Sequence, residues 1–215
     1  MTAFDALSVG FLIEFLVGLR LNLLSAVMAL LLVLPVAYLL AWGLRTGPRP
    51  VRMLLRGVKA LMHATPVFIA MFFLAGMLGD GSALPPLLGR NVPLIILILG
   101  SAPFVLSYGV NQFDAMLRKR AEGDHRAAWL VLPGIGRAMQ VLISTSCLGA
   151  AIGVPEAMSV VMFTSEQIPD PANRMLFYAI CGVLFILAQR LFVLPIRVSH
   201  GVVDRRLRRV AAPQL

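Results

Sequence analysis

The chain alternates between long apolar runs and short charged segments. Five apolar runs are about 20 residues long or longer, which is the length an α-helix needs to cross a hydrocarbon core about 30 Å thick. The pattern therefore predicts five membrane-spanning helices, at residues 21–44, 60–79, 92–113, 129–152 and 175–196. Because the spans follow one another closely, residues 1–215 are expected to form a single transmembrane domain.

The predicted spans are helical. Strands of a membrane β-barrel alternate apolar and polar residues, and these runs do not. Hydrophobic residues make up 59% of the chain and charged residues only 13%, whereas about a quarter of the residues of a soluble domain are charged. The expected fold class is all-α, a polytopic bundle of helices in a membrane.

The formal net charge is +9, and its distribution predicts the orientation of the chain. Cytoplasmic loops of membrane proteins carry an excess of lysine and arginine, so the amino terminus is expected outside and the carboxyl terminus in the cytoplasm. A nucleic-acid partner is not expected, because the charges lie at the ends of the spans. The residues predicted on the cytoplasmic side are Arg45, Arg49, Arg52, Arg56 and Lys59; Arg118, Lys119, Arg120 and Arg126; and Arg197, Arg205, Arg206, Arg208 and Arg209, while the other side has Arg20, Arg90 and Arg174.

Two of the predicted spans carry polar faces. Ser107, Asn111 and Asp114 are spaced i, i+4, i+7 in the third span, and Arg137, Gln140 and Ser144 are spaced i, i+3, i+7 in the fourth. Residues at these spacings share one side of a helix. Polar residues inside a membrane usually face the bundle interior or a water-filled path.

These faces suggest a path for a polar solute, although hydrogen-bonded helix packing would also explain individual hydroxyls. Arg137 is a candidate partner for a carboxylate, or a cation that snorkels to the inner surface. The candidate residues of a substrate path are Thr65, Ser101, Ser107, Asn111, Arg137, Gln140, Ser144, Thr145 and Ser146.

Catalytic chemistry is not expected in this chain. It has no G-x-x-x-x-G-K-[ST] phosphate-binding loop, its three histidines lie far apart, and no pair of carboxylates has the pattern of an acid–base dyad. Cys147 and Cys181 fall inside apolar segments and lack metal-ligand spacing. We therefore expect that the chain is not an enzyme and that it holds no metal ion and no cofactor.

Four stretches carry a resemblance to a known family: "GLRLNLLSAVMALLLVLPVAYLLA" (Gly18–Ala41), "MHATPVFIAMFFLAG" (Met62–Gly76), "SAPFVLSYGVNQFDAML" (Ser101–Leu117) and "STSCLGAAIGVPEAMSV" (Ser144–Val160). They resemble the permease subunits of bacterial ABC importers, specifically the five-span class that takes up polar amino acids or methionine. The first resembles a Gly-Leu-x-x-Thr-Leu opening with Asn22 at the threonine position. The last is the most specific, because it resembles the family's Thr-Ser-Leu-Ala-x-x-Ile-Gly-Val-Pro-Glu-Leu segment.

The resemblance gives a meaning to the charged stretch "RKRAEGDHRAAW", Arg118–Trp129. In the family, this connection carries a Glu-Ala-Ala motif in a short helix that docks into the ATPase subunit and transmits its motion. Glu122 or Asp124 would stand for the glutamate, and Ala127 and Ala128 for the alanines. The implied docking loop comprises Glu122, Asp124, His125, Arg126, Ala127 and Ala128. It is shortened by roughly three turns, since Leu132-Pro133 follows almost at once.

The resemblance implies a multi-pass protein of the bacterial inner membrane that moves a small polar solute. Its expected partners are an ABC ATPase subunit that hydrolyses ATP, a second permease subunit that completes a heterodimer, a periplasmic solute-binding protein and membrane lipid. The shortened loop leaves an alternative open, namely a degenerate permease-like scaffold or regulatory subunit that translocates nothing. The sequence does not identify the solute.

Overall fold

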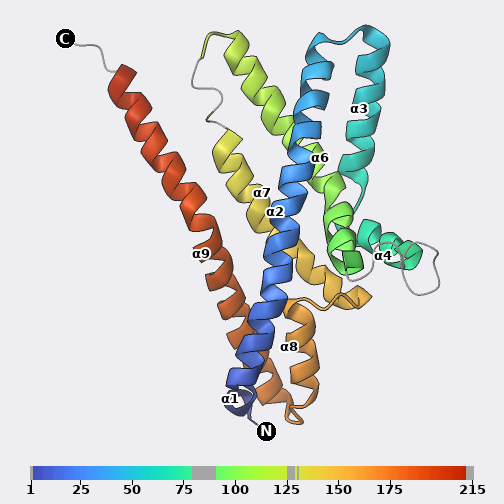
Figure 1. Cartoon of the computed structure of the whole chain (residues 1–215), viewed down its shortest axis with the longest axis vertical. Helices are drawn as coiled ribbons and strands as arrows, with labels where there is room; N and C mark the ends of the chain where they lie inside the picture. Colours follow the sequence, from blue (N-terminus) through green and yellow to red (C-terminus); the bar gives the residue numbers. More distant parts are fainter. Residues whose placement is uncertain (1, 79–90, 125–128, 130, 212–215) are drawn as a thin grey trace.

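The computed structural model describes residues 2–78, 91–124, 129 and 131–211. All regular elements of these residues are helices, so the all-α expectation is confirmed (Figure 1). In chain order they are α1 Ala3–Ala6, α2 Val9–Thr46, α3 Arg49–Ala64, α4 Val67–Leu78, α6 Val92–Ala121, α7 Val131–Ser146, the 3₁₀-helix η3 Cys147–Ile152, α8 Ala157–Glu166 and α9 Pro171–Ala211.

Four helical segments are long and apolar enough to cross a membrane, by length and composition: Val9–Thr46, Val92–Ala121, Val131–Ile152 and Pro171–Ile196. A fifth is added if α3 and α4 are counted as one bent span. The multi-pass prediction is therefore confirmed. The helices α2, α6 and α9 extend past the ends of the three predicted spans that they contain.

The helix is broken within the predicted second span, 60–79. Residues 60–64 end α3, the chain bends by 89°, and α4 begins at Val67. Thr65 is extended, with φ −78° and ψ 113°. Proline disfavours the helical conformation in the residue before it and lacks an N–H to donate, so Pro66 explains why the helix breaks here.

The long helix α2 forms the centre of the bundle (Figure 1). It packs against α3, α6, α7 and α8. Its buried positions include Ala26, Ala29, Ala37 and Ala41, whose small side chains let neighbouring helices come close. A Cβ added at Gly109 of α6 would lie only 2.8 Å from the Cβ of Ala37, so α2 and α6 are in close contact at this point.

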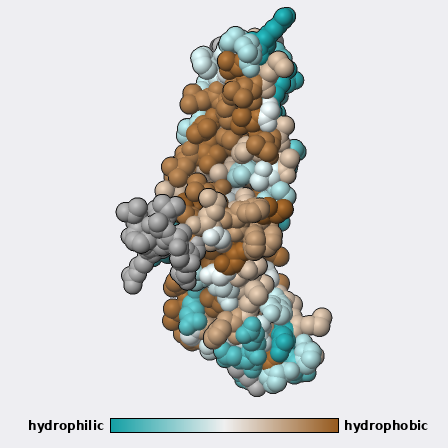
Figure 2. Space-filling view, turned by 90° about the vertical axis from the view of Figure 1, so that its right-hand side faces the viewer, coloured by the Kyte–Doolittle hydropathy of each residue, from teal (hydrophilic) through white to brown (hydrophobic). Residues whose placement is uncertain are grey.

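The surface separates into polar and apolar zones. In the side view of Figure 2, hydrophobic surface covers much of the upper part of the molecule and hydrophilic residues gather at its two ends. The upper end in Figure 1 contains the α2–α3 connection and the carboxyl end of α6, with Arg45, Arg49, Arg118, Lys119 and Arg120. We call this the basic end. Its assignment to the cytoplasm remains a prediction from the positive charges.

Candidate functional site

A cavity of about 270 Å³ lies beside the bend between α3 and α4. It is bounded by the end of α3, the start of α4 and the middle of α6. Its polar lining residues are His63, Thr65, Ser107, Tyr108 and Asn111, and the others are Met62, Pro66, Val67 and Phe104. Thr65, Ser107 and Asn111 of the predicted substrate path thus come together around one cavity, although they come from two separate predicted spans.

Two hydroxyl groups of this cavity donate their protons to backbone carbonyl oxygens nearby. Thr65 Oγ1 donates to the carbonyl oxygen of Leu61 at 2.8 Å, and Ser107 Oγ donates to that of Phe104 at 3.2 Å. Each hydroxyl has one proton and two lone pairs, so both oxygens can still accept a hydrogen bond. Asn111 is exposed and can donate or accept. The cavity therefore suits a small solute that offers N–H or O–H groups.

The other hydroxyls of the predicted path lie elsewhere. Ser101 is buried and donates to its own helix, to the carbonyl oxygens of Leu97 at 2.8 Å and Ile98 at 3.0 Å. Thr145 likewise donates to the carbonyl oxygen of Leu142 at 3.2 Å. Thr65 and Ser107 bond within their own helices in the same way, but only they line the cavity, so Ser101 and Thr145 serve helix packing.

The polar face of α7 meets α9. Gln189 of α9 donates through Nε2 to Ser144 Oγ at 2.8 Å and to the carbonyl oxygen of Gln140. Ser144 and Arg137 are exposed. This face thus lies at the junction of two helices and does not open into the cavity at the α3–α4 bend. Sequence reasoning missed Gln189, although a glutamine inside an apolar span is itself a signal of a polar partner.

A buried polar cluster joins α2, the last residue of α7 and the start of α8. Asn22 is 0% exposed; its Nδ2 donates to Ser146 Oγ at 2.7 Å and to Glu156 Oε2 at 2.9 Å, and its Oδ1 accepts from the backbone N–H of Ala157 at 3.1 Å. Glu156 is also 0% exposed and caps α8, accepting from the N–H groups of Met158 at 2.9 Å and Ser159 at 3.1 Å. The carboxyl is thus surrounded by donors at a helix amino terminus, where negative charge is favoured.

The backbone around this cluster is closely packed and needs glycine at two positions. A Cβ added at Gly18 would lie 2.6 Å from the nitrogen of Ala157, so only glycine allows α2 to touch the start of α8. Gly153 ends η3 with φ +81°, a conformation that favours glycine. Ser146, a predicted path residue, is used here for structure. The sequence pattern did not predict that Asn22 and Glu156 pair, since they lie 134 positions apart.

The predicted ATPase-docking loop follows the end of α6. Arg118, Lys119 and Arg120 form the last turn of this helix, so the charged stretch begins as helix and not as loop. Glu122 follows as the C-cap, and Gly123 has φ +89°. Asp114 pairs with Arg118 at 3.1 Å and with Arg45 at 3.4 Å. His125, Arg126, Ala127 and Ala128 lie outside the described residues, so the docking helix remains a prediction.

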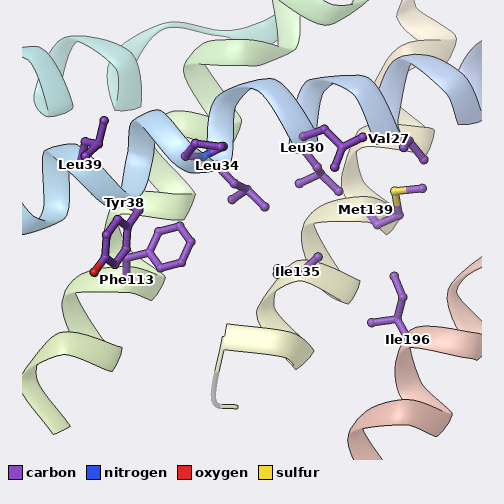
Figure 3. Close-up of a pocket in the computed structure, with 11 residues that line it drawn as sticks. Val27, Leu30, Leu34, Tyr38, Leu39, Phe113, Ile135, Met139 and Ile196 are labelled. Carbon is purple, nitrogen blue, oxygen red and sulfur yellow. The ribbon is translucent and has the colours of Figure 1, made fainter. Parts of the chain in front are cut away.

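A larger, apolar cavity of about 700 Å³ lies between α2, α6, α7 and α9. Figure 3 shows Leu30 and Leu34 of α2 facing it, with Phe113 beside Tyr38 and with Met139 and Ile196 across from them. The rings of Tyr38 and Phe113 meet edge to face, with centroids 5.4 Å apart. Because its lining is almost entirely hydrocarbon, this cavity does not suit a polar solute.

Two carboxylates outside the spans have structural partners. The backbone N–H of Asn173 donates to the carboxylate of Asp170 at 2.9 Å and holds the pKa of Asp170 below its usual range. Hydrogen bonds from Thr2 do the same for the pKa of Asp5. Within the described ranges, no group of three or more His, Cys, Asp and Glu residues is placed to hold a metal ion.

Neither a family model nor a curated protein matches the chain. Among solved structures, it is similar to a chain of one described as "Crystal structure of an amino acid ABC transporter with histidines". The TM-score is 0.62 at 15% identity, and the match covers 92% of this chain and 96% of the other. The chain shares the fold of that protein chain. The fold implied by the sequence resemblance is confirmed, while the type of solute and the coupling loop remain predictions.

Proposed function

We propose that this chain is the permease subunit of an ABC importer of the bacterial inner membrane and moves a small polar solute through the membrane. The observation that carries the proposal is the similarity of fold over nearly the whole of both chains. The apolar spans and the polar cavity beside the α3–α4 bend support it. ATP hydrolysis is assigned to a separate ATPase subunit, and a periplasmic binding protein delivers the solute.

The resemblance and the cavity together favour an amino acid or a related compound as the solute. Thr65, Ser107 and Asn111 provide hydrogen-bonding groups on its wall. The opposite wall would come from a second permease subunit, because the cavity opens on the surface of this chain next to exposed helix faces. We assign this chain to the weaker half of a heterodimer, since its predicted docking loop is short.

The decisive experiment is purification of the native complex through a tag on this chain, followed by reconstitution in lipid vesicles. An ATPase, a second permease and a binding protein should copurify, and solute-loaded binding protein should stimulate ATP hydrolysis. Changing Ala127 and Ala128 to aspartate should reduce the stimulated rate, whereas Ala172→Asp, at the other end of the bundle, should not. Absence of any ATPase from the complex would refute the proposal.

The orientation has its own test. Single cysteines at Thr46 and at Ser82, which lies outside the described residues, are placed in a chain lacking Cys147 and Cys181. In intact spheroplasts an impermeant thiol reagent should label the cysteine at position 82 and not the one at position 46. Labelling of position 46 alone would show that the basic end faces outward.

A further inference from the structure

The basic residues of α3 form a continuous stripe. Arg49, Arg52, Arg56, Lys59 and His63 follow one another at spacings of three, four, three and four residues, so all five lie on one side of the helix. The helix contains no acidic residue. We call these five side chains the basic stripe. The sequence interpretation placed its first four members in a cytoplasmic loop, whereas the structure places them along a helix wall.

The basic stripe has no protein partner in the part of the chain that the structure describes. The ion pairs there join Asp114 to Arg45 and Arg118, and the stripe side chains make no hydrogen bond or ion pair among the described residues. None of the residues of α3 is buried. Four unpaired cations on one helix would be costly in contact with hydrocarbon, but not when they face water.

The rest of α3 indicates where the hydrocarbon lies. Val51, Leu54 and Leu61 are 41%, 67% and 62% exposed and lie on a different side of the helix from the basic stripe. The helix runs beside the upper halves of α2 and α6, at a level where Figure 2 shows much hydrophobic surface. One side of α3 thus suits lipid, and the stripe side suits an aqueous space.

The stripe also connects two described places. Its last member, His63, lines the polar cavity with Thr65, Ser107 and Asn111. Its first member, Arg49, begins α3 at the basic end of the bundle. The charged members from Arg49 to Lys59 therefore place positive charge along about 15 Å of α3, ending one turn before the His63 side of the cavity.

We propose that the basic stripe is an electropositive lane that guides the carboxylate, or another anionic group, of the solute between the cavity and the basic end. This inference rests on the proposed function and narrows its substrate class to solutes that carry an anionic group. The hydroxyl oxygens of Thr65 and Ser107 can accept hydrogen bonds from the solute's N–H groups, while the stripe attracts its negative group. A zwitterionic or anionic solute fits both features, and a purely cationic solute does not.

The test measures the electrostatic potential at the cavity on the full chain in lipid nanodiscs. Asn111→Cys is introduced into a background lacking Cys147 and Cys181, and its reaction rates with a sulfonate-bearing and a trimethylammonium-bearing methanethiosulfonate are compared. The rate with the anionic reagent is divided by the rate with the cationic reagent, and this ratio is normalised to that of a free thiol. It should exceed the ratio at Ser144→Cys on α7 and fall as salt screens the field.

Neutralising the basic stripe should remove the preference of the cysteine at position 111 for the anionic reagent. A unit charge about 10 Å away in water changes the local concentration of a singly charged reagent about twofold at low salt. Arg56→Gln with Lys59→Gln should therefore lower the ratio at least fourfold, whereas Arg190→Gln, an exposed arginine on α9, should leave it unchanged. An uncharged reagent must react at an unchanged rate, which shows that the variant is folded. A ratio near that of a free thiol, or one insensitive to the double substitution, overturns the proposal.

Two further experiments test two alternatives. In the first alternative the stripe binds lipid headgroups, and in the second the chain has no ATPase partner. If adding anionic lipid to zwitterionic nanodiscs abolishes the preference, the stripe binds lipid headgroups and the lane is refuted. In the reconstituted complex, solutes with a carboxylate should stimulate hydrolysis and their amides should not. A preserved reagent ratio in a chain that never associates with an ATPase would refute the permease assignment but not the electropositive stripe, so the two failures are distinguishable.

Discussion

Replacing Asn22 by leucine tests whether the buried polar cluster holds α2 to α7 and α8. The change removes the bonds to Ser146, Glu156 and Ala157 and leaves a buried carboxyl short of a donor. Interhelical hydrogen bonds in membranes contribute about 0.6 kcal/mol on average, but an unsatisfied buried group costs about 1–3 kcal/mol more. For three bonds we expect a loss of about 3–5 kcal/mol, which for a chain of this size lowers the melting temperature by about 6–20 °C.

The assay is thermal unfolding in detergent micelles, followed by circular dichroism. Ser25→Ala is the matched control, because this buried hydroxyl donates only to the carbonyl oxygen of Asn22 in its own helix, and its loss should cost less than about 1 kcal/mol. A double-mutant cycle with Ser146→Ala should give a coupling energy of about 1 kcal/mol. Equal melting temperatures for Asn22→Leu and the wild type would show that the cluster does not hold these helices together.

Gly18→Ala should destabilise the chain, since its Cβ would meet the backbone of α8 at 2.6 Å, while Gly57→Ala on the open side of α3 should stabilise it by about 0.5–1 kcal/mol. Both are read from melting temperatures, and a neutral Gly18→Ala would argue against the close contact. The pKa of Asp170 is lowered in the folded chain. The stability that its ionised carboxylate adds is therefore present above the ordinary pKa of about 3.9 and is lost as the pH falls through the lower folded value. Hydrogen exchange at the Asn173 amide should therefore show less protection in acid, and Asp170→Ala should show that loss at neutral pH; pH-independent protection would contradict this. Ser144→Cys should react with a small aqueous thiol reagent and Leu142→Cys, 2% exposed, should not; the reverse would mean that α7 is rotated.

Hydropathy predicted a multi-pass helical bundle and the approximate place of its apolar helices, because a membrane helix must be apolar for about 20 residues. It did not predict where α2 begins, since Glu14 and Arg20 interrupt the apolar pattern there, whereas packing of Phe11, Phe15 and Leu19 and the cap at Ser8 continue the helix. The bend of the second span depended on a local signal, Pro66, which breaks the helix even though the residues around it are largely apolar. Length and hydropathy alone do not distinguish a bent span from a straight one.

The candidate site was predictable in part. Helical spacing grouped Ser107 with Asn111 on one face, and the cavity contains both. Spacing within one helix does not tell which helix lies opposite, so the sequence did not separate Ser101 and Ser146, which are used in packing, from Thr65, which lines the cavity. The partners Gln189 and Glu156 depend on contacts between segments distant in sequence, which one sequence alone does not reveal.

The length of α2 has a consequence for how this protein survives outside a complex. Its 38 residues span about 57 Å, nearly twice the hydrocarbon thickness of about 30 Å, and a tilt of about 20° removes only a few ångströms of the excess. Val9, Ile13 and Val17, near its amino end, are 74%, 58% and 66% exposed. In the proposed importer complex, a partner subunit would cover the part of this apolar surface that lies beyond the bilayer. An orphan copy of the chain would therefore tend to aggregate or be degraded, and its cellular abundance should follow that of its partners.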